Sequence, residues 1–501
     1  MTKNGSNNHW FNSRTFWAFA AVMVVAVYFF GLTIPLVGPD EPRYSQVARE
    51  MFERGDLVTP TLGGYHWFEK PALLYWLQIA SYRVFGVTEF AARFGSALFG
   101  LGTVLSMWLL GRSINGKLSN DGVLNFGKLL GLLAATSIGI IVFARGASFD
   151  IILTFPMTAA LVCFYIWDRK QNSLVPLTGF YLFIGLALLA KGLIGIVFPF
   201  AIVSFYFVLS WKWPGNKVLF SVLWGTVISL LVASLWYLPM YLTNGWEFID
   251  EFFIQHHFQR YTSNKYFHPQ PFYFFFWVLP LMTIPWLPFF VSGVWRSVKN
   301  IFEGGDDFDT RFNSLLQFAA AWLLVPLVFF SFSGSKLPGY ILPALPPALI
   351  FAAVAIVRYL KKRPGREMYI VGIAAATFGV VIMLLVTAVP RFADDDSVKR
   401  LLAEADARGY SDAEVLSQHA INHNAEFYAA GRLLRSADGK QMRLYGVNEI
   451  LNEIRRRNGN PVLILVPNEW AHQSLESPLL KAELIARNSE TSIIAARENT
   501  P

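Results

Sequence analysis

The stretch Val37–Met51, VGPDEPRYSQVAREM, follows an apolar run directly and places Asp40, Glu41 and Arg43 within four positions. The apolar run from about Thr15 is long enough for a bilayer-spanning helix, which needs about 20 residues. It exceeds a signal-peptide core of roughly 7–15 residues, and no small-residue cleavage site follows, so we expect an uncleaved span. Leaving a membrane requires only a few polar residues, so an acidic pair beside an arginine needs another explanation.

The composition indicates an integral membrane protein. Of the 501 residues, 54% are hydrophobic and only 15% are charged, whereas soluble domains carry about 25% charged residues. The net charge of +8 suits nucleic acid, anionic lipid or phosphate, and the apolar bulk argues against a nucleic-acid partner. The single cysteine, Cys163, excludes an intramolecular disulfide.

We expect a mainly α, polytopic protein with about 11–13 spans, because apolar segments of spanning length recur along the chain. The candidate spans lie at about 15–37, 90–111, 128–145, 150–167, 175–190, 192–210, 217–242, 273–295, 313–333, 339–358 and 368–390.

The loops assigned to the cytoplasmic side are all basic, and the last of them, RYLKKRPGR, is the most basic. By the positive-inside rule the N-terminus is then cytoplasmic, and Asp40, the loop 243–272 and everything after Pro390 lie outside. Seven basic residues remain on the outer side without a topological reason, and we expect them to bind an anion. They are Arg43, Lys70, Arg145, Lys191, Arg260, Lys265 and Lys336.

The first outer loop, about 38–89, is expected to form two interfacial helices. One begins at Pro42 and ends at Gly55, and the other begins at Pro71. The apolar face of the first helix comprises Tyr44, Val47, Ala48 and Met51.

The composition changes after residue 390, and helix-like and strand-like patterns alternate, as in NEILNEIRRR and PVLILVP. We therefore expect a transmembrane catalytic domain over 1–390 and a periplasmic, soluble α/β domain over 391–501.

Each charge cluster has a bland and a functional interpretation. Asp40 or Glu41 could simply cap an interfacial helix, or a carboxylate there could act as a base or metal ligand oriented by Arg43. Glu69 and Lys70 could form a surface ion pair, or they could favour an anion at the N-terminus of the helix that begins at Pro71.

Two further clusters lie at the ends of spans. Arg145 and Asp150 in ARGASFDIILTF could anchor the chain at the interface, and Lys191 could snorkel; charges next to apolar spans are also functional candidates. His256 and His257 are adjacent and lack an HExxH pattern, which disfavours a structural zinc site. One His with Arg260 suits a phosphate better.

Lys336 and Tyr340, in SGSKLPGYILPALPP, repeat the pattern of a lysine before a proline-started helix. Taken together, the outer clusters combine carboxylates with many phosphate-type donors, which favours a lipid-linked phosphate as substrate.

The segment DEPRYSQVAREMFERGDLVTPTLGGYHWFEKPALLYW resembles the first outer loop of GT-C glycosyltransferases of the aminoarabinose-transferase and protein-O-mannosyltransferase group. RGASFDIILTF, LLAKGLIGIVFP, HHFQRY and SKLPGYILPALPP resemble later blocks of that family in the same order, so the similarity spans about 35–350. The C-terminal domain resembles the family's periplasmic domain more loosely.

The resemblance implies inverting sugar transfer from a polyprenyl-phosphate donor, typically undecaprenyl phosphate, at the periplasmic face of the bacterial inner membrane. The acceptor would be lipid A, another envelope glycan or a protein. Asp40 and Asp150 would be the catalytic carboxylates. The donor phosphate and sugar would be held by Arg43, Glu69, Lys70, Lys191, His257, Arg260, Lys336 and Tyr340.

The family's His-x-x-Arg spacing selects His257, and Trp67 stands where the family often has Tyr. No cofactor is required by this chemistry, although a divalent metal is compatible with Glu69 and His256. Two other classes share many spans and buried charges: a lipid or solute transporter, and a non-catalytic envelope assembly protein. A transporter would place its charges at mid-bilayer between inverted repeats, whereas these charges cluster on one face and we find no repeat.

Overall fold

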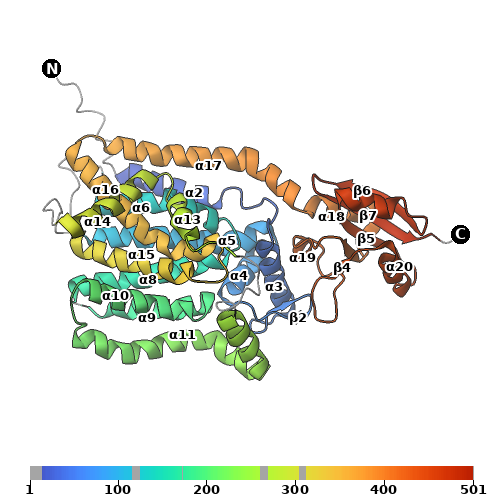
Figure 1. Ribbon diagram of the computed structural model, residues 1–501, viewed down its shortest axis with the longest axis horizontal. Helices are drawn as coiled ribbons and strands as arrows, with labels where there is room; N and C mark the ends of the chain where they lie inside the picture. The colour runs from blue at the N-terminus through green and yellow to red at the C-terminus, as the bar shows by residue number, and fades with distance from the viewer. Residues whose placement is uncertain (1–13, 115–123, 172, 260–268, 304–311, 500–501) are drawn as a thin grey trace, which may run out of the picture. The chain divides into compact units, whose positions relative to one another are not determined.

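The computed structural model describes residues 14–114, 124–171, 173–259, 269–303 and 312–499. It confirms the mainly α fold with a C-terminal sheet (Figure 1). By contacts the chain divides into two compact units. The first comprises 1–30, 68–74 and 93–382, and the second comprises 31–67, 75–92 and 383–501. The boundary at residue 390 stays a prediction, and each unit is described by itself.

Helices overlap all eleven candidate spans, and they belong to the first unit except for residues 89–92 of α5 and 383–396 of α17, which belong to the second. They are α2 (Arg14–Phe29), α5 (Glu89–Ser113), α6 (Phe126–Thr136), α7 (Ile138–Ala144), α8 (Phe149–Lys170), α9 (Val175–Lys191), α10 (Ile194–Leu209), α11 (Asn216–Phe248), α13 (Phe274–Met282), α14 (Leu287–Glu303), α15 (Asn313–Ser331), α16 (Leu345–Lys362) and α17 (Glu367–Asp396). Two short elements complete the set, the π-helix η1 (Ile249–Gln259) and the 3-10 helix η3 (Pro338–Ala344).

Six helical segments of the described chain are long and apolar enough to cross a membrane, and α6 with α7 makes a seventh if this pair, bent by 57°, counts as one span. Three shorter apolar helices, α2, α9 and α10, fall below that length. The total of 11–13 spans therefore stays a prediction.

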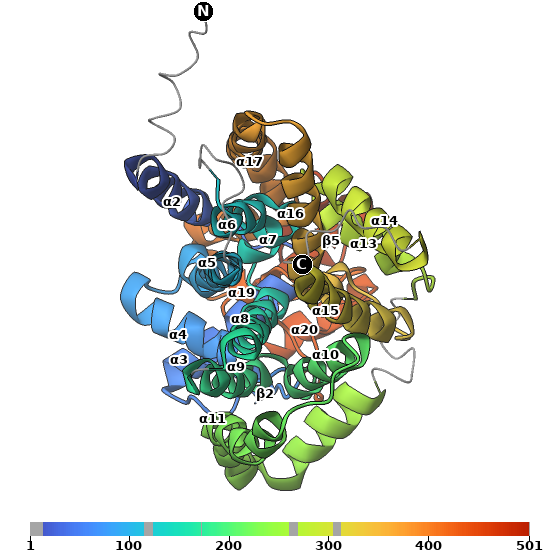
Figure 2. The same cartoon turned by 90° about the vertical axis from the view of Figure 1, so that its left-hand side faces the viewer.

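Aromatic packing holds the first unit together. Helix α8 lies against α9, which in turn lies against α11, while α10 lies against α15 (Figures 1 and 2). The Phe164 ring on α8 is 5.5 Å from that of Phe180 on α9 and 6.3 Å from that of Phe318 on α15. Because lipid tails are as apolar as these side chains, such close packing, rather than burial from water, associates the helices.

In the second unit, the outer loop forms α3 (Asp40–Arg54), a hairpin of β1 (Thr61–Leu62) and β2 (Tyr65–His66), and α4 (Leu73–Phe85). The expected apolar face of α3 is confirmed, since its four residues are buried. Gly55 ends the helix with a left-handed φ of 67°, a conformation that glycine adopts without steric cost.

Both expected starts in this loop were wrong by two residues. Helix α3 begins at Asp40 instead of Pro42, because the first-turn carboxylates favour the positive end of the helix and extend it backwards. Proline is still tolerated as the third helical residue, since first-turn N–H groups have no helical partner. Helix α4 begins at Leu73 instead of Pro71, because residues 68–70 form a turn.

The C-terminal part of the second unit is an α/β sandwich around a five-stranded sheet of order β4-β3-β5-β7-β6. The strands are β3 (Val415–Gln418), β4 (Arg443–Leu444), β5 (Val462–Pro467), β6 (Leu480–Arg487) and β7 (Thr491–Glu498). Strands β4, β3 and β5 are parallel, and β7 pairs antiparallel with β5 and β6.

Both faces of this sheet are covered, which explains the continuous apolar run of β5. Helix α18 (Lys399–Ala405) contributes to the core on one face, and α20 (Val447–Arg456) contributes to the core on the other. The connections also contain η4 (Asp406–Tyr410), α19 (Ala425–Tyr428), η5 (Asn468–Trp470) and α21 (Ala471–Leu475).

Candidate active site

The two acidic residues at the start of α3 differ in exposure and in hydrogen-bond partners. Glu41 is 9% exposed, and its Oε2 accepts a hydrogen bond of 3.0 Å from the backbone N–H of Val37, which fixes the chain entering the helix. The Asp40 side chain is 48% exposed, and its Oδ1 lies 2.6 Å from Nη2 of Arg43, one turn along. Glu41 therefore performs the structural task, and Asp40 is left accessible beside an arginine.

Arg43 is held from three sides. Besides its bond to Asp40, its Nε donates to the carbonyl of Pro39 at 2.8 Å, and its guanidinium lies 5.8 Å from the centre of the Trp67 ring. The indole Nε1 of Trp67 is buried and has no hydrogen-bond partner among the described residues. Trp67 therefore presents a donor N–H next to the Arg43 guanidinium.

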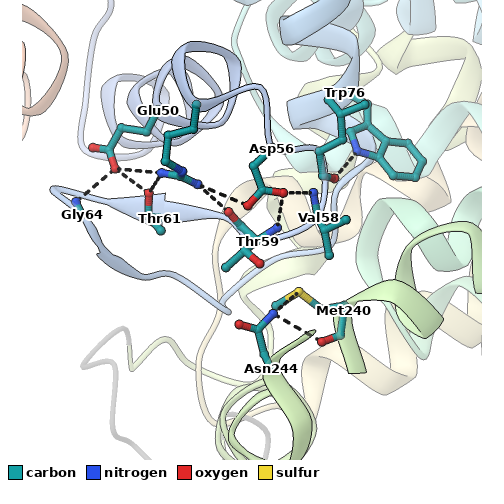
Figure 3. A network of polar contacts seen from close by, with 11 residues as sticks. Glu50, Asp56, Val58, Thr59, Thr61, Gly64, Trp76, Met240 and Asn244 are labelled. Atoms are coloured by element: carbon teal, nitrogen blue, oxygen red, sulfur yellow. Dashed lines mark hydrogen bonds and ion pairs between the residues drawn. The ribbon is translucent and has the colours of Figure 1, made fainter. Parts of the chain in front are cut away.

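A polar network fixes the hairpin that leads to Trp67 onto α3 (Figure 3). The Glu50 carboxylate accepts hydrogen bonds of 2.6 Å from both the Thr61 hydroxyl and the Gly63 N–H. The Arg54 guanidinium donates to the carbonyl of Thr59 at 2.7 Å. Because Glu50 and Arg54 lie on the same helix as Arg43, the aromatic ring and the guanidinium are positioned by one element.

The carboxylate of Asp396, the last residue of α17, holds the backbone just before Asp40. Its Oδ2 accepts 2.8 Å and 3.3 Å hydrogen bonds from the N–H of Gly38 and the amide of Asn424. Gly38 has φ +65°, which is costly for residues with a Cβ. Sequence reasoning missed this contact, because the partners are 358 positions apart.

His423, in the C-terminal part of the second unit, lies close enough to Asp40 and Arg43 to interact electrostatically with both. Burial, and then the positive charge of Arg43, hold the pKa of His423 below its ordinary value of 6.5, while Asp40 acts in the opposite direction. Sequence reasoning missed His423 as well; HAINHNAEF offered a histidine in a loop but nothing that linked it to residue 40.

In the first unit the structure brings together Asp150, Lys191 and Tyr340, three residues singled out from the sequence. Lys191 Nζ forms an ion pair with Asp150 Oδ1, and the two side chains are only 15% and 17% exposed. The ammonium also lies 4.9 Å from the centre of the Tyr340 ring. The cluster is therefore a buried, charge-neutral pair under an aromatic ring.

Helix ends explain why this pair is stable. Asp150 is the second residue of α8, whose first N–H groups favour an anion, and the N–H of Asp150 donates to the hydroxyl of the N-cap Ser148 at 3.1 Å. Lys191 is the last residue of α9, where carbonyl groups favour a cation. A Cβ at Gly339 would overlap with Oδ2 of Asp150, so any larger residue there would displace the Asp150 carboxylate.

Two of the outer basic residues serve the fold. The Arg145 guanidinium donates to the carbonyls of Val27, at 2.8 Å, and Phe30 at the end of α2, which is the anchoring alternative. The ammonium of Lys336 donates to the carbonyls of Ser333 at 2.6 Å and Gln270 at 3.1 Å. Burial lowers the pKa of Lys336 below 10.5, and its role toward a donor phosphate stays a prediction.

The remaining predicted residues are placed only in part. Glu69 and Lys70 are half-buried in the turn before α4 and belong to the first unit. The side chains of His256 and His257, on η1, and the whole of Arg260 lie outside the described residues. Within the described chain no group of three or more His, Cys, Asp or Glu residues could hold a metal ion. The metal suggested for Glu69 and His256 therefore stays a prediction.

Comparisons with known proteins find similar chains. Residues 12–257 match the family model of dolichyl-phosphate-mannose-protein mannosyltransferases. The undecaprenyl phosphate-α-4-amino-4-deoxy-L-arabinose arabinosyl transferase of Aeromonas hydrophila is 31% identical over 372 residues, which are 73% of this chain and 64% of that protein. The enzyme of the same name from Yersinia enterocolitica is 28% identical over 375 residues, 74% of this chain and 64% of that protein.

The chain thus spans somewhat less than two thirds of the length of these curated relatives. Among solved structures, ArnT from Cupriavidus metallidurans bound to undecaprenyl phosphate matches with a TM-score of 0.72 and 25% identity. The match covers 96% of this chain and 98% of that one.

The chain is therefore a multi-span membrane protein with the fold of the GT-C glycosyltransferases. Over nearly three quarters of its length it is similar to the bacterial aminoarabinose transferases.

Proposed function

We propose that this protein is an inverting membrane glycosyltransferase that moves a sugar from a polyprenyl-phosphate donor to a periplasmic envelope acceptor, with lipid A as the first acceptor to test. The observation that carries the proposal is the Asp40–Arg43 pair with the unpaired Trp67 N–H, immediately after the first apolar helix. A carboxylate, a cation and a donor group at the end of a span suit a lipid-linked phosphate.

The comparisons support this choice of donor. The relatives carry undecaprenyl phosphate in their names, and ArnT was crystallised with that lipid. A polyprenyl phosphate is the leaving group in such a transfer, and it gains negative charge as the glycosidic bond breaks. Arg43 is oriented before the reaction by Pro39 and Asp40, so it stabilises that charge without having to reorganise.

The role of Asp40 depends on the acceptor. With a hydroxyl acceptor, Asp40 takes the proton as general base while the oxygen attacks the anomeric carbon opposite the leaving phosphate, which inverts that centre. With a phosphate of lipid A, the attacking oxygen is already anionic, and Asp40 orients the acceptor instead. The roles of Asp150 as a second catalytic carboxylate, and of Lys70, His257 and Arg260 as donor ligands, are part of the same proposal.

The orientation is also proposed. The basic loops that favour a cytoplasmic N-terminus place α3 and the C-terminal domain in the periplasm of a bacterium, with the spans in its inner membrane. A periplasm-active reporter fused after Pro501 should be active, and a fusion that is active only in the cytoplasm would contradict this orientation.

Transfer of labelled sugar from undecaprenyl-phosphate-linked donor to lipid A by the purified full-length protein tests the function. With a hydroxyl of lipid A as the attacking group, Asp40→Asn should lower turnover by about 100-fold or more, the range expected for loss of a general base, with an unchanged melting temperature. Glu53→Gln is the matched control, because Glu53 is an exposed acid on the same helix, 3.3 Å from Arg49.

We expect the wild-type protein and Glu53→Gln to transfer the sugar at similar rates. Asp40→Asn should be nearly inactive. Full activity of Asp40→Asn would remove Asp40 from the chemistry. Release of sugar from the donor with no product on lipid A would support the proposed donor and reject lipid A as the acceptor. The absence of any donor consumption by the wild-type protein would reject the transferase.

A further inference from the structure

A row of aromatic rings lies at one edge of the C-terminal sheet. Strands β3, β4 and β5 are parallel, and β3 lies between the other two, so their carboxyl ends share one edge. His419 follows β3 directly, Tyr445 follows β4 directly, and Trp470 closes the short helix η5 after β5. Three segments separated in sequence therefore each place one ring at this edge.

This edge is also where the chain changes direction across the sheet. From β3 the chain passes to β4 on one side, and then through α20 to β5 on the other side of β3. The carboxyl ends of β3 and β5 consequently form a topological switch point, the place where open α/β sheets bind their ligands. His419 and Trp470 follow these two strands.

The rings are in contact and remain accessible. His419 stacks on Trp470 with 4.7 Å between ring centres and 27° between planes, and it meets Tyr445 edge-on at 6.0 Å. Trp470 is 38% exposed and Tyr445 is 50% exposed. The guanidinium of Arg443 lies 4.9 Å from the centre of the Tyr445 ring. Large rings that are exposed in a row offer flat apolar faces to a ligand.

Polar groups fix this row. The Gln473 Oε1 is 2.8 Å from Nε2 of His419, and the buried Gln418 is held by the hydroxyl of Ser474 at 2.9 Å. His419 adopts φ +61°, a left-handed conformation that residues with a Cβ seldom adopt and that gathers at functional sites. Its N–H donates to the carbonyl of Leu444 at 2.8 Å, so the strained residue is pinned beside β4.

We propose that Trp470, Tyr445, His419 and Gln473 form a binding site for a pyranose ring of an envelope glycan. The apolar C–H face of a sugar ring packs on an aromatic face, and its hydroxyls suit planar amide, imidazole and guanidinium groups. A dinucleotide is the usual ligand at such an edge, but it requires a glycine-rich turn after the first strand. Here that turn, Gln418–Asn424, reads QHAINHN and contains no glycine.

The pyranose has two sources outside the membrane, the sugar part of a glycolipid and a free glycan chain, and two probes distinguish them. Purified full-length protein in detergent is titrated with oligosaccharide from fully deacylated lipopolysaccharide, and separately with chitotetraose. Binding is followed by saturation-transfer-difference NMR on the sugar protons. No polyprenyl donor is added, so the result is independent of the proposed transferase activity.

The test variants are Trp470→Ala and Tyr445→Ala, with Trp470→Phe as the conservative variant. The matched control is Trp213→Ala, because Trp213 is 94% exposed and lies between α10 and α11 in the first unit. Far-ultraviolet circular dichroism and melting temperature identify any variant that fails to fold. In that case Trp470→Phe and Tyr445→Ala decide the result.

The expected result is that wild type and Trp213→Ala bind at least one probe with equal Kd. Trp470→Ala and Tyr445→Ala should weaken that Kd by about tenfold, and Trp470→Phe by less, since a phenyl ring keeps part of the stacking face. Binding of the deacylated oligosaccharide would identify the sugar part of a glycolipid as the source, and binding of chitotetraose would identify a free glycan chain. Failure of both probes to bind wild type, or an unchanged Kd in folded Trp470→Ala, would overturn the proposal.

Discussion

The two units each contain a carboxylate–cation pair, and the two pairs differ in almost every physical respect. Asp40 and Arg43 are three residues apart on one helix, and Asp40 is about half exposed. Asp150 and Lys191 come from two helices, 41 positions apart, and both are less than a fifth exposed. Exposed pairs contribute about 0–1 kcal/mol to stability, whereas removing one partner of a buried pair costs about 3–5 kcal/mol.

The difference is in how much each pair contributes to the stability of the fold. A pair that contributes little to folding can be exchanged for contacts with a substrate at little cost, as the proposed chemistry at Asp40 requires. The buried pair instead fixes α8 against α9, and its helix-end charges are neutralised within the protein. The two acidic residues are therefore expected to respond very differently to substitution.

The largest effect should come from removing one charge of the buried pair. Lys191→Met should lower the free energy of unfolding by about 3 kcal/mol, because Asp150 is left buried and uncompensated. Arg43→Gln should change it by less than about 1 kcal/mol. Thermal melts in detergent compare the two, and Asp150→Asn combined with Lys191→Met should recover most of the loss. Equal changes in melting temperature for Lys191→Met and Arg43→Gln would show that the two pairs do not differ in their contribution to stability.

Crowding the same pair should have the next largest effect. Gly339→Ala places a methyl group against Asp150 and 2.8 Å from a ring carbon of Phe143, so overpacking should cost about 2 kcal/mol. Gly372→Ala is the matched control, because nothing lies within 4 Å of a Cβ there. A melting temperature for Gly339→Ala equal to that of the control would show that Asp150 and Phe143 move aside at little cost in stability.

The exposed pair should be sensitive to its backbone support. Asp396→Ala removes the acceptor for the Gly38 N–H and should lower turnover about tenfold, equivalent to about 1.4 kcal/mol, with little change in KM. Asp396→Asn keeps an acceptor oxygen and should restore most activity, which a loss of folding would not explain. Asp394→Ala, an exposed acid half a turn earlier, is the control. Unchanged turnover in Asp396→Ala would show that Gly38 needs no such support.

The smallest effect concerns pH. Because the pKa of His423 is lowered in the fold, the unfolded chain binds this proton at higher pH than the native protein. Stability is then lost as the pH falls below 6.5 toward the lowered value. His423→Gln should reduce the fall in melting temperature between pH 7 and pH 5.5 by on the order of 1 °C. An identical fall in both proteins would show that His423 does not contribute.

The sequence predicted the features that depend on local periodicity or on strong apolar runs. The buried face of α3 followed from helical spacing, its end at Gly55 from a glycine signal, and β5 and α20 from their hydrophobic patterns. The resemblance then added the order of the later blocks and a catalytic role for Asp40, which stays a prediction. These signals lie within short windows, so one sequence is enough to read them.

The features it missed depend on how distant segments meet. Nothing near residue 150 indicates that Lys191 is its partner, because the pairing depends on the packing of α8 against α9. Glu41 and Asp40 are chemically alike, and only the direction of the chain at Val37 decides which one caps the entry. Asp396 and His423 are ordinary polar residues until the tertiary fold places them beside the start of α3.

The bond between Gly38 and Asp396 has a consequence for the time at which the segment around Asp40 reaches its final structure. Its two ends leave the ribosome 358 residues apart, an interval of about 20–70 s at ~5–20 residues per second. During that interval the segment that bears Asp40 has emerged without its final support. A nascent or prematurely terminated chain therefore inserts its early spans without the support that Asp396 gives to Gly38, and the proposed sugar transfer begins only when synthesis is nearly finished.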